Sequence, residues 1–379
     1  MTDEPRTTLT LPSYGEGTLA DLASSLLASL GLVREPNPLG LPETGRACLL
    51  IVDGLGWELL RDHPAAAPFL SELAFSGRPL TAGFPSTTVT SLASLGTGLP
   101  PGVHGMLGYQ VAVPGTGRIL NGLRWDSRVD PLTWQPQPTI YERAAAAGIG
   151  AFQVAAGAYQ KTGLTQAVWR GAKYRRADSM GALAAQAGAA LREAENALVT
   201  VYLGDLDATG HVFGCGSDAW YYQLGHVDKL AEQLASELPS GTLLYVTADH
   251  GMLDISQAHR VDVDALADLR KGVALLGGEP RARHVYAEPG AADDVLAAWR
   301  DVLGERARVV SRDEAINGGW FGPVEPGIAD RIGDVVAAAA GDTGIVATQA
   351  EPRESALVGM HGSLTTAEQL VPLLAHGSL

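Results

Sequence analysis

Five short apolar runs recur along this chain of 379 residues, and they show little of the polar alternation that a half-exposed strand has. Such runs are typical of strands covered on both faces, as in a parallel sheet between two helical layers. The expected strands are ACLLIV from Ala47, GAFQVA from Gly150, ALVTVYL from Ala197, TLLYVTA from Thr242 and SALVGM from Ser355. The expected helices between them are Tyr141–Gly148, Met180–Asn196 and Trp220–Glu237. The pattern predicts an α/β fold, a three-layer α/β/α sandwich with a mostly parallel central sheet.

One later segment departs from this alternation. It contains two expected strands, RARHVYAEP and RARVVSR, on either side of an expected helix, DDVLAAWRDVL, and then Gly- and Pro-rich sequence. We therefore expect residues 259–328 to form a small α+β insertion. Residues 1–258 and 329–379 would form the two parts of the core, and the run RIGDVVAAAA would return the chain to it. Near the amino terminus, Leu19–Leu32 has helical spacing and is expected to be a surface helix.

The net charge of the chain limits the classes of molecule that it is expected to bind. The formal net charge of −15 argues against polymeric nucleic acid, which needs a basic surface, but small phosphate esters remain possible if bound cations reverse the local field. The start of the chain, MTDEPRTT, lacks the basic and apolar regions of a signal peptide, and Leu19–Leu32 is too short and polar to span a membrane. We expect a cytoplasmic protein without a membrane partner.

The residues that follow the expected strands are unusual. Each strand except GAFQVA is followed by carboxylates, imidazoles or both. These residues are Asp53, Asp207 with His211, Asp249 with His250, and His361. A single Asp-Gly pair is more often a turn than a site. Turn chemistry does not explain histidines at three strand ends, however, and ligands collect at the carboxyl ends of parallel strands.

Asp and His side chains together predict a metal site. Carboxylate oxygen and imidazole nitrogen suit zinc or a similar divalent ion. Asp207 and His211 are one helical turn apart, so both could face the same ion. Six candidate ligands are too many for one tetrahedral zinc with an open position, but they suit two zinc ions with three ligands each. Two neighbouring metal ions can promote displacement at phosphorus.

The segment FPSTTVTSLASLGTG, Phe84–Gly98, supplies a candidate nucleophile. Pro85 and Ser86 indicate the start of a helix, which places Thr88 near its first turn. Free backbone amides at a helix amino terminus favour an alkoxide and the oxygens of a phosphate. From this segment alone, however, simple capping by its hydroxyl residues is the more common arrangement.

The order of these motifs resembles the alkaline phosphatase superfamily, and it is most similar to the type I phosphodiesterase and nucleotide pyrophosphatase branch. The resemblance rests on LLIVDGLGW, FPSTTVTSLASLGTGLPPGVHG, DATGH, TADHGM and GMHG, from about Cys48 to His361. It implies Thr88 as the residue that becomes phosphorylated. It also implies one zinc ion held by Asp53, Asp249 and His250, and a second held by Asp207, His211 and His361.

The resemblance has one gap. The family's asparagine that contacts a phosphate oxygen has no counterpart, and its place falls near Tyr109, which is either a hydroxyl donor to substrate or an ordinary packed aromatic. The implied activity is hydrolysis of phosphodiesters or nucleotide pyrophosphates. A phosphomonoesterase, a phosphonate hydrolase and a non-catalytic metal-binding module are the alternatives. No arginine is identifiable from sequence as a ligand for a doubly charged monoester.

Overall fold

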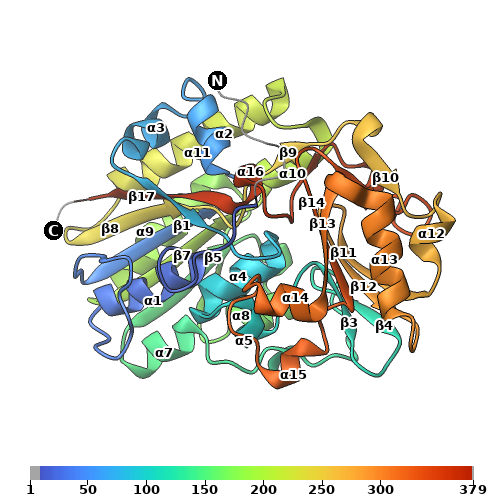
Figure 1. The fold of residues 1–379 in the computed structure, drawn as a ribbon. Helices are drawn as coiled ribbons and strands as arrows, with labels where there is room; N and C mark the ends of the chain where they lie inside the picture. The colour runs from blue at the N-terminus through green and yellow to red at the C-terminus, as the bar shows by residue number, and fades with distance from the viewer. Residues whose placement is uncertain (1–8, 378–379) are drawn as a thin grey trace.

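The computed structural model describes residues 9–377. The expectation that the chain lacks a signal peptide rests on residues 1–8 and therefore lies outside the described residues. The molecule contains a large sheet covered by helices on both sides and a smaller sheet beside it (Figure 1). In the described part of the chain, no helix combines the length and the apolar composition needed to cross a bilayer.

The central sheet has seven strands in the order β2-β17-β8-β1-β7-β5-β6. β1 pairs in parallel with both β7 and β8, and β5 pairs in parallel with β6 and β7, whereas β17 runs antiparallel to β2 and β8. The α/β fold with a mostly parallel sheet is thus confirmed. The strands are β1 Arg46–Val52, β2 Arg78–Thr81, β5 Gly150–Ala155, β6 Lys173–Arg176, β7 Ala197–Leu203, β8 Thr242–Thr247 and β17 Leu370–His376.

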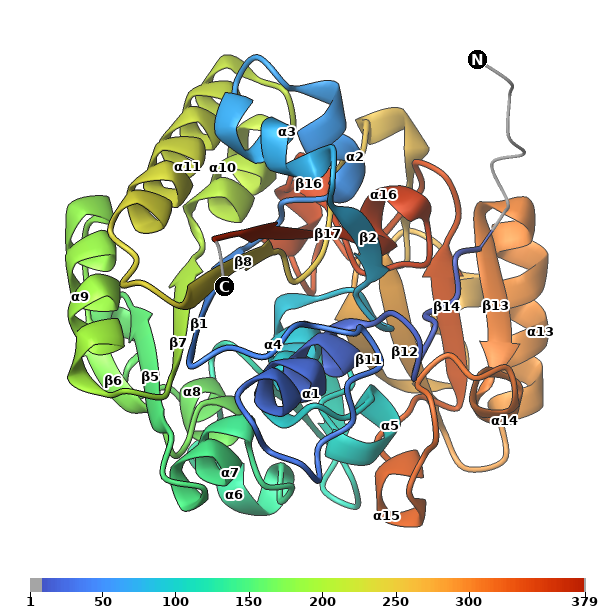
Figure 2. The same ribbon diagram turned by 90° about the vertical axis from the view of Figure 1, so that its left-hand side faces the viewer.

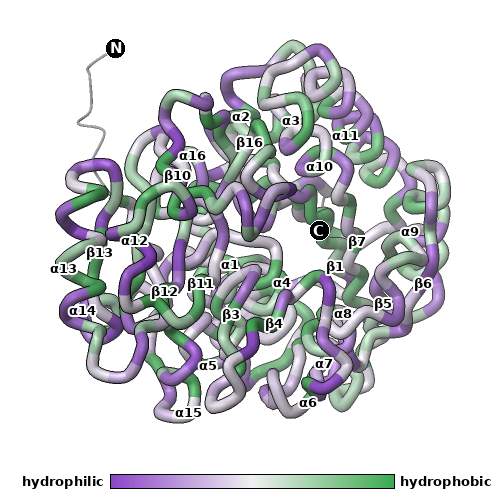
Figure 3. Tube along the Cα trace, turned by 90° about the vertical axis from the view of Figure 1, so that its right-hand side faces the viewer, coloured by the Kyte–Doolittle hydropathy of each residue, from purple (hydrophilic) through white to green (hydrophobic). Residues whose placement is uncertain are grey.

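Helices cover both faces of this sheet. Figure 2 shows α3, α9 and α11 on one side and α1, α4 and α7 on the other. The outer helices α9 and α11 alternate between hydrophilic and hydrophobic residues in Figure 3, as expected of helices that bury one face only. Their bounds are α1 Leu19–Ser29, α3 Pro68–Ala74, α4 Thr88–Thr97, α7 Ile140–Ala146, α9 Met180–Glu193 and α11 Asp218–Ser236.

The first helix differs from the prediction. We expected Leu19–Leu32 to lie on the surface, but all residues of α1 except Ala28 are buried. Thr18 and Asp21 form a capping box at its start, and the helix packs against α4 and α7. The serines that suggested exposure are accommodated by bonds to backbone, such as the one from Ser29 Oγ to the carbonyl of Leu26. α1 is therefore a core helix.

The second sheet has four antiparallel strands in the order β11-β12-β14-β13, and α13 packs on it. The sequence reasoning missed β11, and it placed the run that becomes β14 in the main core. β14 instead pairs with β12 and β13, so the sheet extends beyond the expected boundary at residue 328. The elements are β11 Val273–Glu279, β12 Ala282–Ala287, α13 Ala292–Leu303, β13 Ala307–Ser311 and β14 Val335–Ala339.

A fully buried ion pair joins the second sheet to the segment that precedes β17. Arg281 donates through Nε and Nη2 to both carboxylate oxygens of Glu368, at 2.9 and 2.7 Å. The carboxylate of Glu368 also accepts from the backbone of Ser363, two residues after His361. This bidentate pair ties the second sheet to the loop that carries His361.

Candidate metal centre and active-site cavity

Three of the expected site segments lie at the carboxyl edge of the central sheet. Asp53 directly follows β1, and its backbone N–H donates to the carbonyl of Leu203 at the end of β7. Gly54 has φ of +77°, and a Cβ there would lie 3.1 Å from Asp207, so the glycine permits two site segments to approach closely. Asp53-Gly54 is therefore both a turn and part of the site.

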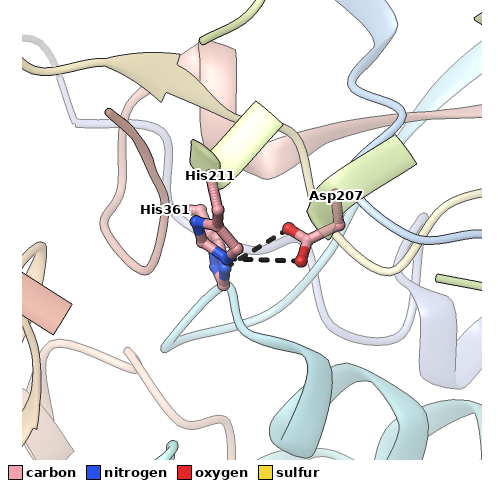
Figure 4. Close-up of side chains that lie close together, drawn as sticks. All are labelled: Asp207, His211 and His361. Atoms are coloured by element: carbon pink, nitrogen blue, oxygen red, sulfur yellow. Dashed lines mark ion pairs between the residues drawn. The ribbon is translucent and has the colours of Figure 1, made fainter. Parts of the chain in front are cut away.

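The first cluster comprises Asp207, His211 and His361. Asp207 and His211 lie on α10, Asp205–Phe213, one turn apart. Nε2 of His211 is 3.2 Å from Oδ2 of Asp207, and Nε2 of His361 is 3.7 Å from Oδ1 of the same carboxylate. Figure 4 shows both imidazoles directed at this carboxylate. The three ligand atoms lie within 4.8 Å of one another, as a shared cation requires.

His361 reaches this cluster by a route that the sequence did not predict. The run SALVGM was expected to be a strand of the central sheet. It forms a short 3₁₀ turn, Glu354–Ala356, and then β16, Gly359–Met360, which pairs with β9, Leu253–Asp254, in a sheet of two strands. The backbone of Val358 also donates to the carbonyl of His211. His361 is therefore positioned by the neighbouring α10 and by this two-stranded ribbon.

The second cluster is more deeply buried. Nε2 of His250 lies 3.3 Å from Oδ1 of Asp53 and 3.5 Å from Oδ2 of Asp249. Asp53, His250 and Asp207 have ligand atoms within 4.8 Å of one another, so Asp207 belongs to both clusters. The rings of His250 and His361 are stacked, with centroids 3.5 Å apart. The structure thus brings all six sequence-predicted ligands together.

The hydrogen bonds of the three histidines determine their tautomers. Each Nδ1 lies beside a backbone carbonyl, which can only accept: Gly359 for His211, Gly251 for His250 and Ser86 for His361. In the neutral rings Nδ1 therefore carries the proton, and the lone pair of each Nε2 faces the carboxylates. Lone pairs directed at carboxylates repel unless a cation lies between them, and this orientation is characteristic of metal-binding histidines.

The carboxylates also need a cation. Oδ1 of Asp53, Oδ1 of Asp207 and Oδ2 of Asp249 are buried without a hydrogen-bond partner within residues 9–377. Burial, followed by the charges of Asp249 and Asp207, raises the pKa of Asp53 well above its ordinary value. Divalent cations would satisfy these oxygens and favour the ionised carboxylates. The donor set therefore fits two metal ions.

Thr88 is the first residue of α4 and is partly exposed. Its Oγ1 lies 3.2 Å from Nε2 of His250. The position that precedes the helix is occupied by Thr87, whose side chain makes no capping bond and is buried. Because Thr88 lies inside the helix and faces the second cluster, it is not the capping residue that the sequence left possible.

A cavity of about 300 Å³ opens beside both Thr88 and the first cluster. Tyr109 lines it, and its hydroxyl donates to Oε1 of Glu354 at 3.0 Å. Two arginines that the sequence reasoning missed, Arg124 and Arg353, also line this cavity. The two arginines lie on loops that are far apart in the sequence, so no local sequence motif indicated that they line one cavity. The polar and charged lining residues are Thr87, Thr88, Tyr109, Arg124, Asp207, His211, Glu279, Arg353, Glu354 and His361.

Tyr202 is a further residue that sequence reasoning missed. It lies in β7, and its buried hydroxyl donates to Oδ2 of Asp53. The ring contacts Trp169 and Tyr159 edge to face, and these aromatics line a second, smaller cavity that also reaches Thr88. The tyrosine inside the apolar run ALVTVYL was the available signal, because a buried tyrosine hydroxyl requires a partner.

Comparison with known proteins agrees with this arrangement. The fold is alkaline phosphatase-like. Residues 47–364 match the model of the type I phosphodiesterase / nucleotide pyrophosphatase family, and the chain belongs to that family. No curated protein sequence matches the chain.

Several solved structures share the fold. Murine ectonucleotide pyrophosphatase / phosphodiesterase 5, as an inactive threonine-to-alanine variant with AMP, is similar at a TM-score of 0.69 and 20% identity, with 88% of each chain covered. Phosphonoacetate hydrolase from Sinorhizobium meliloti 1021 with phosphonoformate has a TM-score of 0.66 and 21% identity, with 89% of this chain and 91% of that chain covered. These structures show the fold, and the family to which the chain belongs supports a phosphoric ester hydrolase.

Proposed function

We propose that this protein is a two-zinc hydrolase that cleaves phosphodiesters or nucleotide pyrophosphates through a phosphorylated Thr88. The observation that carries the proposal is the convergence of three Nε2 lone pairs on buried carboxylates beside a threonine at a helix amino terminus. Membership of the phosphodiesterase and nucleotide pyrophosphatase family supports the same reaction class. The substrates would be small phosphate esters or nucleotides.

In this proposal the six ligands divide into two sets. Asp53, Asp249 and His250 would hold one ion, and the first cluster of Asp207, His211 and His361 would hold the other. Bound zinc would supply Lewis acidity and neutralise charge at the reacting oxygens. Asp207 would also be available to the set that contains Asp53 and His250, because its ligand atom lies within 4.8 Å of theirs.

Thr88 would act as the nucleophile. Its Oγ would form a bond to phosphorus while the bond to the leaving oxygen breaks, and water would then cleave the bond between phosphorus and Thr88 Oγ to restore the hydroxyl. The free amides at the start of the ten-residue helix α4 would favour the negative charge that develops on phosphate oxygens. The similar AMP-bound structure of an inactive threonine-to-alanine variant supports this role for a threonine.

Phosphonate hydrolysis is the second candidate. The similarity to structures of phosphonoacetate hydrolase with phosphonoformate or phosphonoacetate favours it, as do the two arginines in the cavity wall. The threonine hydroxyl beside the candidate ligands argues against a module that only binds metal, because such a module needs no nucleophile.

A substrate panel on zinc-loaded protein tests these possibilities. The panel should contain a nucleoside aryl phosphodiester, a nucleotide pyrophosphate, an aryl phosphomonoester and phosphonoacetate, with zinc content measured on the same sample. We expect the diester or the pyrophosphate to have the highest kcat/KM. A monoester preference of about tenfold or more, equal to about 1.4 kcal/mol of transition-state stabilisation, would instead identify a phosphatase. Turnover of phosphonoacetate alone would identify the second candidate.

A further inference from the structure

The two arginines of the cavity wall lie at its exposed rim. The side chains of Asp207 and His361 are only 14% and 10% exposed, whereas Arg124 and Arg353 are exposed residues of the same cavity. The cavity of about 300 Å³ has more room than a single phosphoryl group needs, and it is within the size range of small-molecule sites. A substrate group that extends from the reacting phosphorus would therefore meet this rim.

Neither rim arginine is neutralised within residues 9–377. The ion pairs found there include those of the buried Arg281 with Glu368 and Arg283 with Glu351, but none contains Arg124 or Arg353. The net charge of the chain is −15, so two unpaired guanidinium groups beside one cavity make a local exception to its acidic character. Positive charge that lines a cleft raises the local concentration of anions.

The backbone at both arginines is held in place. Oδ1 of Asn121, the last residue of β4 (Arg118–Asn121), accepts the N–H groups of Leu123 and Arg124 at 3.0 and 2.9 Å. On the other side of the rim, the backbone carbonyl of Arg353 accepts the N–H of Ala356 at 3.1 Å. Such anchoring lowers the backbone entropy that binding would cost, and the remaining cost is that of ordering the two side chains.

We propose that Arg124 and Arg353 form a subsite for a second anionic group of the substrate, separate from the reacting phosphoryl group. This inference rests on the proposed function, because that function places the reacting phosphorus beside Thr88. A guanidinium fork matches the paired oxygens of a carboxylate or a phosphate. The favoured substrates are therefore phosphorus compounds that carry a further phosphate or a carboxylate a few bonds from phosphorus.

Two carboxyl groups, those of Glu279 and Glu354, line the cavity near this subsite, but they repel an anion less strongly than two free carboxylates would. Oε1 of Glu279 is buried without a hydrogen-bond partner in the described chain, and burial raises the pKa of this carboxyl well above its ordinary value. The carboxylate of Glu354 accepts the hydroxyl proton of Tyr109.

The test compares substrates with and without the second anion. Zinc-loaded wild type, Arg124→Ala, Arg353→Ala and the double variant are assayed with bis(p-nitrophenyl) phosphate, which has one anionic group, and with a dinucleoside pyrophosphate and phosphonoacetate, which have two. In the double variant we expect kcat/KM for a two-anion substrate, relative to that for the diester, to fall by about tenfold or more, mainly through KM. Arg308→Ala is the matched control, because Arg308 is exposed on β13 and does not line the cavity.

The outcomes separate this proposal from the function on which it rests. Loss confined to the pyrophosphate assigns the subsite to phosphate, and loss confined to phosphonoacetate assigns it to carboxylate. Equal changes for all three substrates, or no change, would overturn the subsite.

If the wild type cleaves none of them, the proposed function fails. The subsite alone is then tested by calorimetry, which measures the binding of phosphonoacetate and of inorganic pyrophosphate to the wild type and to the double variant. At least tenfold weaker binding of either anion by the variant would support it, and unchanged binding of both would overturn it.

Discussion

Oγ1 of Thr88 lies 3.2 Å from Nε2 of His250, although 162 residues separate them in the chain. Thr88 lies at the start of α4, and His250 lies in the segment that directly follows β8. Because Nδ1 of His250 bonds the carbonyl of Gly251, the atom that faces Thr88 carries a lone pair. The threonine hydroxyl is therefore adjacent to the position where a metal ion fits, and this relationship underlies the first two predictions.

Replacement of Thr88 should separate chemistry from folding. We expect Thr88→Ala to lower kcat by at least about 10³-fold, because the attacking oxygen is lost. The free energy of unfolding should change by less than about 1 kcal/mol, because Thr88 is not the residue that caps α4. Thr88→Ser should keep substantial activity. Steady-state kinetics and urea unfolding on the same preparations measure both effects.

Thr87 provides the adjacent control. Its Oγ1 is buried and has no hydrogen-bond partner within residues 9–377, so Thr87→Ala should leave most of the turnover intact. An active Thr88→Ala protein beside an inactive Thr87→Ala protein would move the nucleophile to Thr87.

Removal of single ligands should show how the ions are divided. The wild type is expected to contain about two zinc ions per chain, because six ligands form two sets of three. His211→Ala and His250→Ala should each lose about one ion, from different sites. Asp207→Asn should weaken both sites, because Asp207 belongs to both clusters. Elemental analysis after dialysis gives the ion content, and a wild type with about one ion would refute the two-zinc proposal.

Tyr202 should affect metal affinity through Asp53. Its hydroxyl holds Oδ2 of that carboxylate, so Tyr202→Phe should weaken zinc binding about 10- to 100-fold at one site. The matched control is Tyr245→Phe, because the buried hydroxyl of Tyr245 has no hydrogen-bond partner in the described chain. Competition with a zinc chelator measures the affinity. Equal zinc retention by both variants would show that the hydroxyl of Tyr202 does not support the site.

Acid should destabilise the fold through two buried histidines that are not among the candidate metal ligands. Burial lowers the pKa of His104 to about 3, with a contribution from Arg331, and burial lowers that of His284 to about 4. Both are neutral when folded, whereas the unfolded chain takes up their protons below pH 6.5. Stability is therefore lost as the pH falls from about 6.5 toward 4, by up to about 1.4 kcal/mol per pH unit for each histidine.

The dependence on His104 can be isolated by substitution. His104→Gln should reduce the slope of unfolding free energy against pH by up to about 1.4 kcal/mol per unit between pH 6 and pH 4.5, whatever its effect at neutral pH. Urea unfolding at a series of pH values gives the slope. A slope equal to that of the wild type would show that His104 is already protonated in the folded protein.

The sequence by itself determined the fold class and the ligand types. The apolar runs that became β1, β7 and β8 are local features, and so are the Asp and His residues that directly follow them. Because parallel strands end at one edge of a sheet, Asp53, Asp207 and Asp249 had to converge once those strands paired. The motifs that resemble the family's contain the same six residues, so the resemblance implied the same set of ligands. The local pattern also predicted α9, α11 and α13 to within a few residues.

Only the tertiary structure decided what depends on contacts between distant segments. The apolar run SALVGM, which contains β16, has the pattern of a central strand, but its pairing with β9 and its contact with α10 place it elsewhere. Contacts between distant segments also decide the burial of α1, the position of β14 in the second sheet and the bond from Tyr202 to Asp53. They likewise place Arg124 and Arg353 in the wall of one cavity. Periodicity reports which side of an element is apolar, but the partner that covers that side is chosen by the packing of the whole chain.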